Sequence, residues 1–537
     1  MKRSWKAFLS LLLAGAIFTS MAACRTNTPP TESGASSGLQ ADASSSGEGQ
    51  DTNMVTDEQT LTTATSGADS SAATTDANNP AGKPDGKTTK TNSAATRRPT
   101  AETPSTNYPV VVAAAQQAID IIREDPDAKR RLVYLKLTNN EKITRKNCVL
   151  TYVEDGKTST RELSTIYLNE KIVYDTIWLK SGTTAISAVL QDADGKELWK
   201  GSITIGKAKT ERVIAKSTIY NNATLKPGTV RGVNYYPRHT PWSAWTSQSP
   251  STWDSEFKEI SSKLNVNAIR TFAECWETDQ MLGGCATAEY LATIDQLFAA
   301  ASKHGIRVLF CLYSSTPFEN MTKNHRYVRS IVEPFINDGR VLAWDLINEV
   351  DDKGLSEVDY VDEFCLTMYP KLSQFDPNHT NQIGFAFMLD KALKIGLTFT
   401  GKNQSWHYHY YRKTSAENIS QWVSMYFHDT PFFLGECGDT SALEVADGAP
   451  REFLGEGWQL AVYKTLIDAF NGAVANGHKM IGMFPWICFD FPTMANHVTG
   501  QGDFGLIRAD GSLKPAGEYL AAEYAKIKKS RPAQWDK

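Results

Sequence analysis

The order of apolar and polar residues along the chain changes character near residue 230. Beyond that point, short apolar runs alternate with longer segments in which apolar residues recur every three or four positions. The short runs predict β-strands, and the recurring spacing predicts amphipathic helices between them. Strands are expected over 230–235, 268–272, 307–313, 341–347, 382–386, 405–411, 432–435 and 480–487, and helices around 253–264, 291–301, 328–335, 358–368 and 463–474.

Eight strand–helix units over about 300 residues are typical of a (β/α)8 barrel, the TIM-barrel fold. A doubly wound open sheet is the alternative, and it normally carries a glycine-rich phosphate turn after its first strand. The residues at that place, Arg231-Gly232-Val233-Asn234, do not form such a turn. An α/β barrel is therefore the predicted fold of residues 216–537.

Between residues 130 and 209 the apolar runs are short and rich in β-branched residues. Asp155-Gly156 and Asp194-Gly195 are typical hairpin turns between such runs. We predict a small antiparallel β-sandwich of immunoglobulin-like size, assigned to residues 108–215 and entered through a short helix at 112–123. It is either a spacer packed on the barrel, which we favour, or a carbohydrate-binding module. Its strands are expected over 132–137, 148–153, 172–179, 185–190 and 199–205.

The first 107 residues have the composition of an export signal followed by a linker. A positively charged start and an apolar stretch at 8–18 lead to Met21-Ala22-Ala23-Cys24. This run resembles the lipobox of bacterial lipoproteins, which implies cleavage before Cys24 and acylation of its thiol; an ordinary secretory signal is the alternative. Residues 25–107 contain no Phe, Trp or Tyr, so they are predicted to be a disordered tether. The expected location is the cell surface or another extracytoplasmic site, with membrane contact through the lipid only.

Overall composition excludes some classes of function. The 537 residues carry a formal net charge of −4, so no basic excess is available to neutralise the phosphates of a nucleic acid. The seven cysteines other than Cys24 are scattered without CxxC spacing, and no zinc site is predicted. Cys275 and Cys285 are close enough in sequence to form a disulfide, and the sequence leaves their state open.

Two carboxylates directly follow predicted strands. The fourth strand ends in Asn348-Glu349, and the seventh runs into Glu436. Because the carboxyl ends of barrel strands meet at one mouth, we expect both side chains there. Glycoside cleavage needs such a pair, since one carboxyl must be protonated to help the leaving oxygen depart and the other must be ionised to attack the anomeric carbon.

These motifs resemble the signature of clan A glycoside hydrolases, and over about 231–526 the chain is similar to glycoside hydrolase family 5, the cellulase and mannanase family. Three further motifs add to the resemblance: Asn267-Ala268-Ile269-Arg270 in strand 2, His409-Tyr410-Tyr411 in strand 6 and Trp486 in strand 8. It implies a nucleophile at Glu436 and an acid/base at Glu349. The supporting and substrate-binding residues that it implies are Arg270, Asn348, His407, His409, Tyr411 and Trp486, with Tyr411 donating a hydrogen bond to the nucleophile.

The same residues suit these roles on physical grounds. A fixed positive charge at Arg270 would keep Glu436 ionised, whereas Glu349 needs a raised pKa from burial and the nearby negative charge. His407 and His409 lie on one strand face and could hold a metal, but no third ligand is apparent, so no metal or cofactor is predicted.

The chain also departs from the family pattern. Strand 3 ends in Tyr313-Ser314-Ser315, where many family members have a histidine. Glycoside hydrolase family 2, in which sandwich domains precede a related barrel, is the second family considered. Aromatic residues in the loops at 235–245, 274–276 and 489–502 are expected to stack on sugar rings.

The sequence thus predicts a retaining β-glycosidase that acts on a β-linked glucan or mannan, or on oligosaccharides from one, through a glycosyl-enzyme intermediate. The two catalytic carboxyl groups should then lie about 5–5.5 Å apart. A transglycosylase on the same barrel and a non-catalytic carbohydrate-binding surface lipoprotein are the alternatives.

Overall fold

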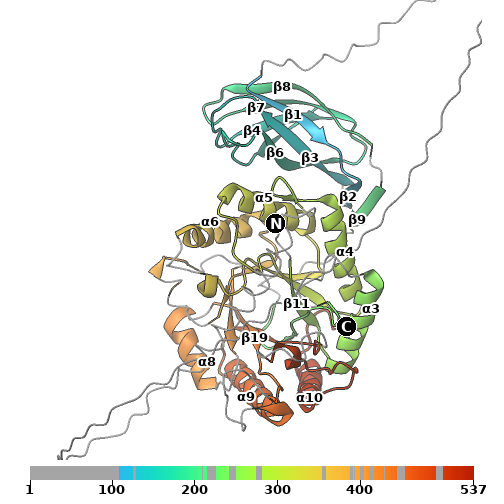
Figure 1. The fold of residues 1–537 in the computed structure, drawn as a ribbon, viewed down its shortest axis with the longest axis vertical. Coiled ribbons are helices and arrows are strands. Elements are labelled where there is room, and N and C mark those ends of the chain that lie inside the picture. The colour runs from blue at the N-terminus through green and yellow to red at the C-terminus, as the bar shows by residue number, and fades with distance from the viewer. Residues whose placement is uncertain are drawn as a thin grey trace, which may run out of the picture. The chain divides into compact units, whose positions relative to one another are not determined.

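The computed structural model describes residues 108–124, 129–207, 210–214, 225–240, 249–273, 281–353, 359–386, 391, 394–398, 404–410, 416–427, 430–443, 454–491 and 500–536. All of them belong to one compact unit of mixed α/β structure (Figure 1). The predicted signal peptide, Cys24 and the tether lie outside the described residues. None of the described helices is both long enough and apolar enough to cross a bilayer.

The first part of this unit consists of two β-sheets. One has the order β1-β3-β2-β9 with β6 paired to β3, and the other has the order β5-β4-β7-β8. Their facing residues form a separate apolar cluster that includes Leu135, Leu150 and Leu190. The strands are β1 (Val110–Ala115), β2 (Ile119–Arg123), β3 (Arg130–Asn139), β4 (Val149–Glu154), β5 (Lys157–Glu162), β6 (Ile172–Lys180), β7 (Ala185–Gln191), β8 (Glu197–Thr204) and β9 (Thr210–Ile214).

The predicted helix at 112–123 is wrong. This segment forms β1, which pairs antiparallel with β3, and β2, which pairs parallel with β9. Val110 and Val112 point into the core and Val111 does not, which is the period of a strand. Pairing with strands distant in sequence overrides the helix propensity of the alanine-rich stretch, and the parallel β2–β9 pair means that the sheets are not wholly antiparallel.

The remainder of the unit contains two parallel sheets, and every strand predicted after residue 230 overlaps an observed one. One sheet has the order β10-β20-β19-β18-β17 and the other β11-β14-β15-β16. The predicted fifth strand is divided into two short strands. The strands are β10 (Val230–Arg231), β11 (Ala268–Phe272), β14 (Arg307–Cys311), β15 (Val341–Asp345), β16 (Thr380–Gln382), β17 (Gly384–Phe385), β18 (Trp406–Tyr410), β19 (Phe432–Cys437) and β20 (Met480–Pro485).

Backbone hydrogen bonds also link the edges of these two sheets. After β10 the chain continues beside β11, where the Tyr235 N–H donates to Arg270 O at 2.8 Å and the Arg270 N–H donates to Val233 O at 3.0 Å. At the opposite edges, a parallel bridge joins Asn381 of β16 to Gln404 before β18.

Helices surround these strands in Figure 1. The face predicted from Trp253 to Leu264 is fully buried in α3, and the side chain of Ser249 caps this helix by accepting from the Thr252 N–H. The helices are α3 (Pro250–Leu264), α4 (Ala288–Lys303), α5 (Met321–Val332), α6 (Asp359–Phe375), α8 (Ala416–Trp422), α9 (Gly455–Ala475) and α10 (Pro515–Ser530). Shorter elements are β12 (Met281–Leu282), β13 (Cys285–Ala286), η1 (Glu333–Phe335), η2 (Val350–Lys353), η3 (Val423–Phe427) and η6 (Gln501–Asp503).

Polar contacts join the N-terminal sheets to the helical part. Arg161 in β5 donates two hydrogen bonds to the carboxylate of Glu333 in η1, at 3.0 and 2.9 Å. Arg326 in α5 donates to Thr165 O at 2.8 Å. Paired groups of this kind hold the two parts of the unit in contact.

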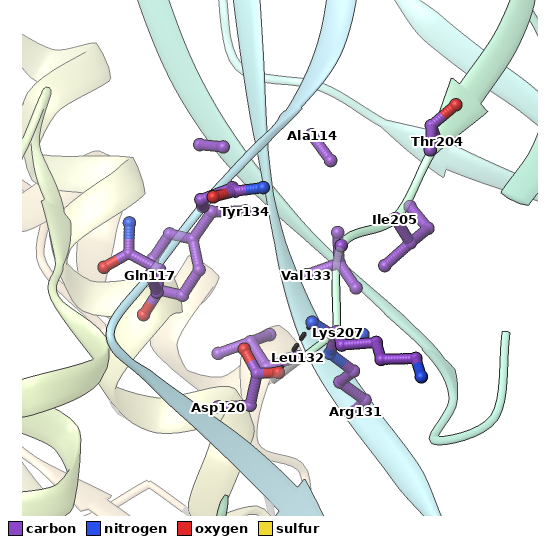
Figure 2. Close-up of a pocket in the computed structure, with 13 residues that line it drawn as sticks. Ala114, Gln117, Asp120, Arg131, Leu132, Val133, Tyr134, Thr204, Ile205 and Lys207 are labelled. Atoms are coloured by element: carbon purple, nitrogen blue, oxygen red, sulfur yellow. Dashed lines mark ion pairs between the residues drawn. The ribbon is translucent and has the colours of Figure 1, made fainter. Parts of the chain in front are cut away.

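A pocket lies in the N-terminal sheets, between β1, β2, β3 and the segment after β8 (Figure 2). Arg131 and Asp120 form an ion pair in it, with Nη2 and Oδ2 2.6 Å apart. Tyr134 is the one aromatic residue in its lining, and the Tyr134 hydroxyl is already used in a hydrogen bond to Ala286 O at 2.8 Å. The choice between a spacer and a carbohydrate-binding module stays a prediction.

Candidate active site

Glu349 and Glu436 lie together at the carboxyl ends of their strands. Glu436 is in β19, and Glu349 follows β15 by four residues. Both are buried: Glu436 is 3% exposed and Glu349 is 5% exposed. One carboxylate oxygen of each, together with a ring nitrogen of His409, forms a group in which all atoms lie within 4.8 Å of one another. The structure therefore brings the two predicted carboxylates into one site.

Glu349 has an unusual backbone conformation. Its φ of 46° falls in the left-handed region, which residues other than glycine rarely adopt. The neighbouring backbone holds this bend, since the Asn348 N–H donates to Tyr313 O at 2.9 Å and the Asp352 N–H donates to Glu349 O at 3.0 Å. Strained residues of this kind are concentrated at functional sites.

Arg270 connects most of the polar groups of the site. It is fully buried in β11, and its Nη1 donates to Glu436 Oε1 at 2.6 Å and to Asn234 Oδ1 at 3.1 Å. Its Nη2 donates to Asn348 Oδ1 at 2.7 Å and to Asp345 Oδ2 at 2.9 Å. Burial alone would lower the pKa of Arg270, but Asp345 and Glu436 outweigh it and raise that pKa. The guanidinium is thus a fixed positive charge against Glu436.

Asp345 belongs to the site although it was not among the residues predicted from the sequence. It lies in β15, is fully buried, and also receives a hydrogen bond from Arg270 Nε at 3.1 Å. Burial raises the pKa of Asp345 to about 6, opposed by the charge of Arg270. A carboxylate within an otherwise apolar strand was the available signal, because buried carboxylates are rare unless they are paired.

His409 lies between the two glutamates. Its Nδ1 is 3.0 Å from Glu349 Oε1 and 3.5 Å from Glu436 Oε2. Burial, followed by the positive charges of Arg270 and Lys353, lowers the pKa of His409 well below its usual value. The imidazole is therefore neutral and carries one N–H.

His407 lies deeper than His409, and the rings are 5.1 Å apart. It is fully buried, and its Nε2 is 3.5 Å from Asp345 Oδ2. Gly384 and Gly435 flank the ring closely. A Cβ added at Gly384 would lie 1.8 Å from Nε2 of His407, and one added at Gly435 would lie 2.0 Å from its Nδ1. This fully buried position suits support of the site better than the predicted contact with substrate.

Trp486 follows β20 and packs edge-on against the rings of Tyr236 and Phe272, at 6.1 Å in both cases. It is 5% exposed, and its peptide bond to Ile487 is cis. Tyr411, the remaining predicted site residue, lies outside the described residues.

Burial raises the pKa of the Glu349 carboxyl above its usual value. The charges of Lys353 and Arg270 and a hydrogen bond from Asn348 Nδ2 to Glu349 Oε2, at 3.3 Å, act in the opposite direction and do not cancel this effect. A raised pKa keeps a carboxylic acid protonated closer to neutral pH, as a general acid requires.

Glu349, His409 and Glu436 could also hold a metal ion by their spacing. Two ligands of this group are glutamates distant in sequence from His409, which the histidine pair alone does not reveal. However, the guanidinium of Arg270, 2.6 Å from Glu436, is a positive charge that would repel a divalent cation. The donor set is therefore better suited to proton transfer than to metal binding.

Some residues expected to stack on sugars serve the core instead. Tyr235 is fully buried, and its hydroxyl donates to Glu256 Oε2 at 2.6 Å. Tyr236 stacks on Phe272 with ring centroids 5.1 Å apart. Phe489 and Phe491 of the third loop are fully buried as well, and the tryptophans of the loops at 242–245 and 274–276 lie outside the described residues. So does Cys275, while Cys285 is a buried free thiol.

No family model and no curated protein matches the chain. Among solved structures, the exo-β-1,4-mannosidase Op5Man5 from Opitutaceae bacterium strain TAV5 is similar over 59% of this chain and 63% of its own, at 16% identity and a TM-score of 0.47. A β-glucuronidase from Bacteroides uniformis is similar over 77% of this chain and 50% of its own, at 14% identity and a TM-score of 0.42. GH5_18 from Streptomyces cattleya, in complex with GlcNAc, is similar over 57% of this chain and 82% of its own, at 14% identity and a TM-score of 0.47.

The chain therefore spans less than two thirds of the first two of these proteins. TM-scores below 0.5 do not establish a shared fold. The function of the chain is accordingly inferred from the chemistry of its own site.

Proposed function

We propose that this protein is a retaining β-glycosidase that hydrolyses β-linked oligosaccharides or polysaccharides of the glucan or mannan type. The observation that carries the proposal is the closeness of Glu349 and Glu436, whose nearest carboxylate oxygens lie within 4.8 Å, with a fixed cation on Glu436. An inverting enzyme needs a separation of about 6.5–9.5 Å to admit a water molecule between the carboxylates. The 4.8 Å limit applies to one oxygen of each carboxylate rather than to the whole groups, and this closeness supports direct attack on the sugar.

In the first half of the reaction, Glu436 attacks the anomeric carbon while Glu349 gives its proton to the leaving oxygen. In the second half, Glu349 removes a proton from water, and the resulting hydroxide releases the sugar from Glu436. Asn348, which accepts a hydrogen bond from Arg270, would bond the hydroxyl next to the reacting carbon. Trp486 provides an apolar surface beside the site.

We further propose that the two parallel sheets are the halves of a (β/α)8 barrel with this site at its mouth. The backbone hydrogen bonds between Tyr235 and Arg270, and the bridge between Asn381 and Gln404, support the proposal because they join the two sheets at both edges. A closed ring of strands brings strand ends distant in sequence to one rim.

Anchoring through a lipid on Cys24 remains part of the proposal. Expression in a bacterium with lipoprotein processing should place the full chain in the membrane fraction, and Cys24→Ser should release it. A wild-type protein without acyl chains, measured by mass spectrometry of its N-terminal peptide, would contradict this anchoring.

Proton NMR of fresh reaction mixtures tests the proposed function. The full chain is incubated with a panel of β-glucan and β-mannan oligosaccharides and of aryl β-glycosides. We expect the β-anomer of the new reducing sugar to appear first and to mutarotate later. A first-formed α-anomer would exclude retention, absence of turnover on the panel would favour a non-catalytic binding protein, and longer oligosaccharides would indicate a transglycosylase.

A further inference from the structure

The pocket in the N-terminal sheets (Figure 2) opens where the pairing of β3 with its neighbours is interrupted. β1 pairs with β3 as far as Ala115, opposite Tyr134, and β2 resumes the pairing at Ile122, opposite Arg131. More residues lie between Ala115 and Ile122 than between their partners in β3, so the surplus residues leave the ladder. Such interruptions turn side chains in a new direction, and here they leave a hollow beside β3.

This hollow is small, and polar side chains make up much of its wall. Its volume is about 50 Å³, which is room for about three or four water molecules. Gly206 after β8 keeps it open, because a Cβ added there would lie 3.0 Å from Nε2 of Gln116. The polar side chains of the wall are Gln116 and Gln117 between β1 and β2, Asp120 in β2, Arg131 and Tyr134 in β3, Thr204 in β8 and Lys207 after it.

The ion pair of Asp120 and Arg131 has unused capacity for hydrogen bonds. A guanidinium has five N–H donors, and a carboxylate accepts about four hydrogen bonds. Within the described part of the chain, neither side chain has a polar partner other than the other member of the pair. Asp120 is 6% exposed, and its burial raises its pKa although the charge of Arg131 opposes the rise. A ligand that donates to this carboxylate would replace water that burial has removed.

The charges of the wall favour a neutral ligand. The carboxylate of Asp120 repels an anion, and the cations of Arg131 and Lys207 repel a cation. A carboxylate beside a guanidinium suits two adjacent hydroxyl groups, since one hydroxyl donates to the carboxylate while its neighbour accepts from the guanidinium. The amides of Gln116 and Gln117 each offer a further donor and acceptor.

We propose that this pocket binds the hydroxyl-bearing edge of one unit of a neutral sugar, as a second carbohydrate site that shares no residue with the candidate active site. Tyr134 is 2% exposed, so hydrogen bonds rather than ring stacking provide the recognition. The N-terminal sheets would then be a carbohydrate-binding module and not a spacer alone. The inference goes beyond the proposed function and does not depend on it, because none of the groups involved is catalytic.

NMR of the full chain, labelled with 15N at its glutamine side-chain amides, tests the proposal at the pocket itself. The chain is titrated with glucose and with mannose, which have no glycosidic bond to cleave, and with sodium sulfate as the anion. The signals of Gln116 and Gln117 are assigned by their loss in Gln116→Ala and Gln117→Ala. We expect both signals to move with at least one sugar, with half-saturation on the order of 1 mM for a ligand of this size, and not to move with sulfate.

Two variants test the pocket in different ways. Gly206→Val fills it without removing a polar group, and Asp120→Asn replaces the charged acceptor with an amide of the same shape. Each should weaken sugar binding by about tenfold or more, the loss expected for a hydrogen bond to a charged group. Glu197→Gln, exposed in β8, is the control that should bind as the wild type does. Thermal melting shows whether each variant folds.

Three results would overturn the proposal. The first is that neither glutamine signal moves at sugar concentrations far above the expected half-saturation. The second is that sulfate moves the signals and the sugars do not, which would make the pocket an anion site. The third is that the sugar-induced shifts persist unchanged in both variants when these are folded. The titration needs no turnover, so a chain without glycosidase activity would still give a decisive answer.

Discussion

Glu349 and Glu436 are both buried glutamates, yet their neighbours differ in charge. Arg270 donates to Glu436 at 2.6 Å. In the described part of the chain, the side chains bonded to Glu349 are the neutral groups of His409 and Asn348. A contacting cation stabilises an ionised carboxylate, and burial without one favours the protonated acid. This contrast supports the proposal that Glu436 is the nucleophile and Glu349 the acid.

Azide should distinguish the two roles. Glu349→Ala should lose about 10²–10⁴-fold in rate on a poor leaving group, because general acid catalysis is removed. An activated aryl glycoside should still form the intermediate, and azide should restore its turnover as the β-glycosyl azide, since this anion needs no general base. Product anomers are identified by NMR.

Glu436→Ala is the matched variant, and it should be nearly inactive because no glycosyl-enzyme forms. Azide would then attack the substrate directly and give the α-glycosyl azide. If the α-azide came from Glu349→Ala and the β-azide from Glu436→Ala, the two roles would be exchanged.

Lys353 should limit the pH range of the enzyme. Burial raises the pKa of Glu349, and the positive charge of Lys353 opposes this rise. In Lys353→Met the pKa of Glu349 should rise further, and a general acid works only below its pKa. The alkaline limb of the kcat/KM profile should therefore move to higher pH. Lys528→Met, on the exposed face of α10, is the control, and an alkaline limb that moved equally in both variants would refute the local effect.

At the scale of secondary-structure elements, η1 joins the N-terminal sheets to the helices. Glu333 in η1 receives two hydrogen bonds from Arg161 in β5 and one from Arg329 in α5, the latter at 2.9 Å. Burial would raise the pKa of Glu333, but the two arginines outweigh it and hold that pKa below its usual value. The ionised form of this carboxyl is thus favoured in the folded protein.

Glu333→Gln should lower the free energy of unfolding at pH 7 by about 2 kcal/mol, because two half-buried arginines, Arg161 and Arg329, lose their charged partner. A carboxyl with a depressed native pKa stabilises the fold above its unfolded pKa, about 4.3, and loses this effect as pH falls through the native value. The difference in the free energy of unfolding between wild type and variant, measured by urea unfolding, should therefore shrink from pH 7 to pH 3. Glu197→Gln, exposed in β8, is the control, and a difference independent of pH would contradict this account.

At the scale of the whole molecule, the 107 residues before Tyr108 should be dispensable for catalysis. Residues 25–107 have no aromatic side chain and too little apolar surface to form a core. A chain that begins at Tyr108 should keep the kcat/KM of the full chain on a soluble oligosaccharide and the same Tm. A fall in kcat/KM would show that the linker takes part in catalysis.

A chain that begins at residue 130 provides the contrasting deletion. It lacks β1 and β2, and β1 pairs with β3 along its entire length, from Val110 to Ala115. We expect this chain to melt at a lower temperature, because β3 loses its hydrogen-bonded neighbour and Val110 and Val112 leave the core.

The amino-acid sequence by itself determined the alternation of strands and helices after residue 230 and the choice of Glu349 and Glu436. Both are local properties. An apolar run has a length and a period that can be read without knowing its partners, and a carboxylate directly after such a run lies at a strand end wherever that strand is placed.

Only the tertiary structure decided features that depend on partners distant in sequence. β1 and β2 are strands because β3 and β9 supply their hydrogen bonds, and the polar strand β5 exists through its pairing with β4. Asp345 reaches Arg270 across 75 residues, and His409 reaches Glu349 across 60. Such contacts follow from how strands are arranged side by side, which periodicity along one segment does not encode.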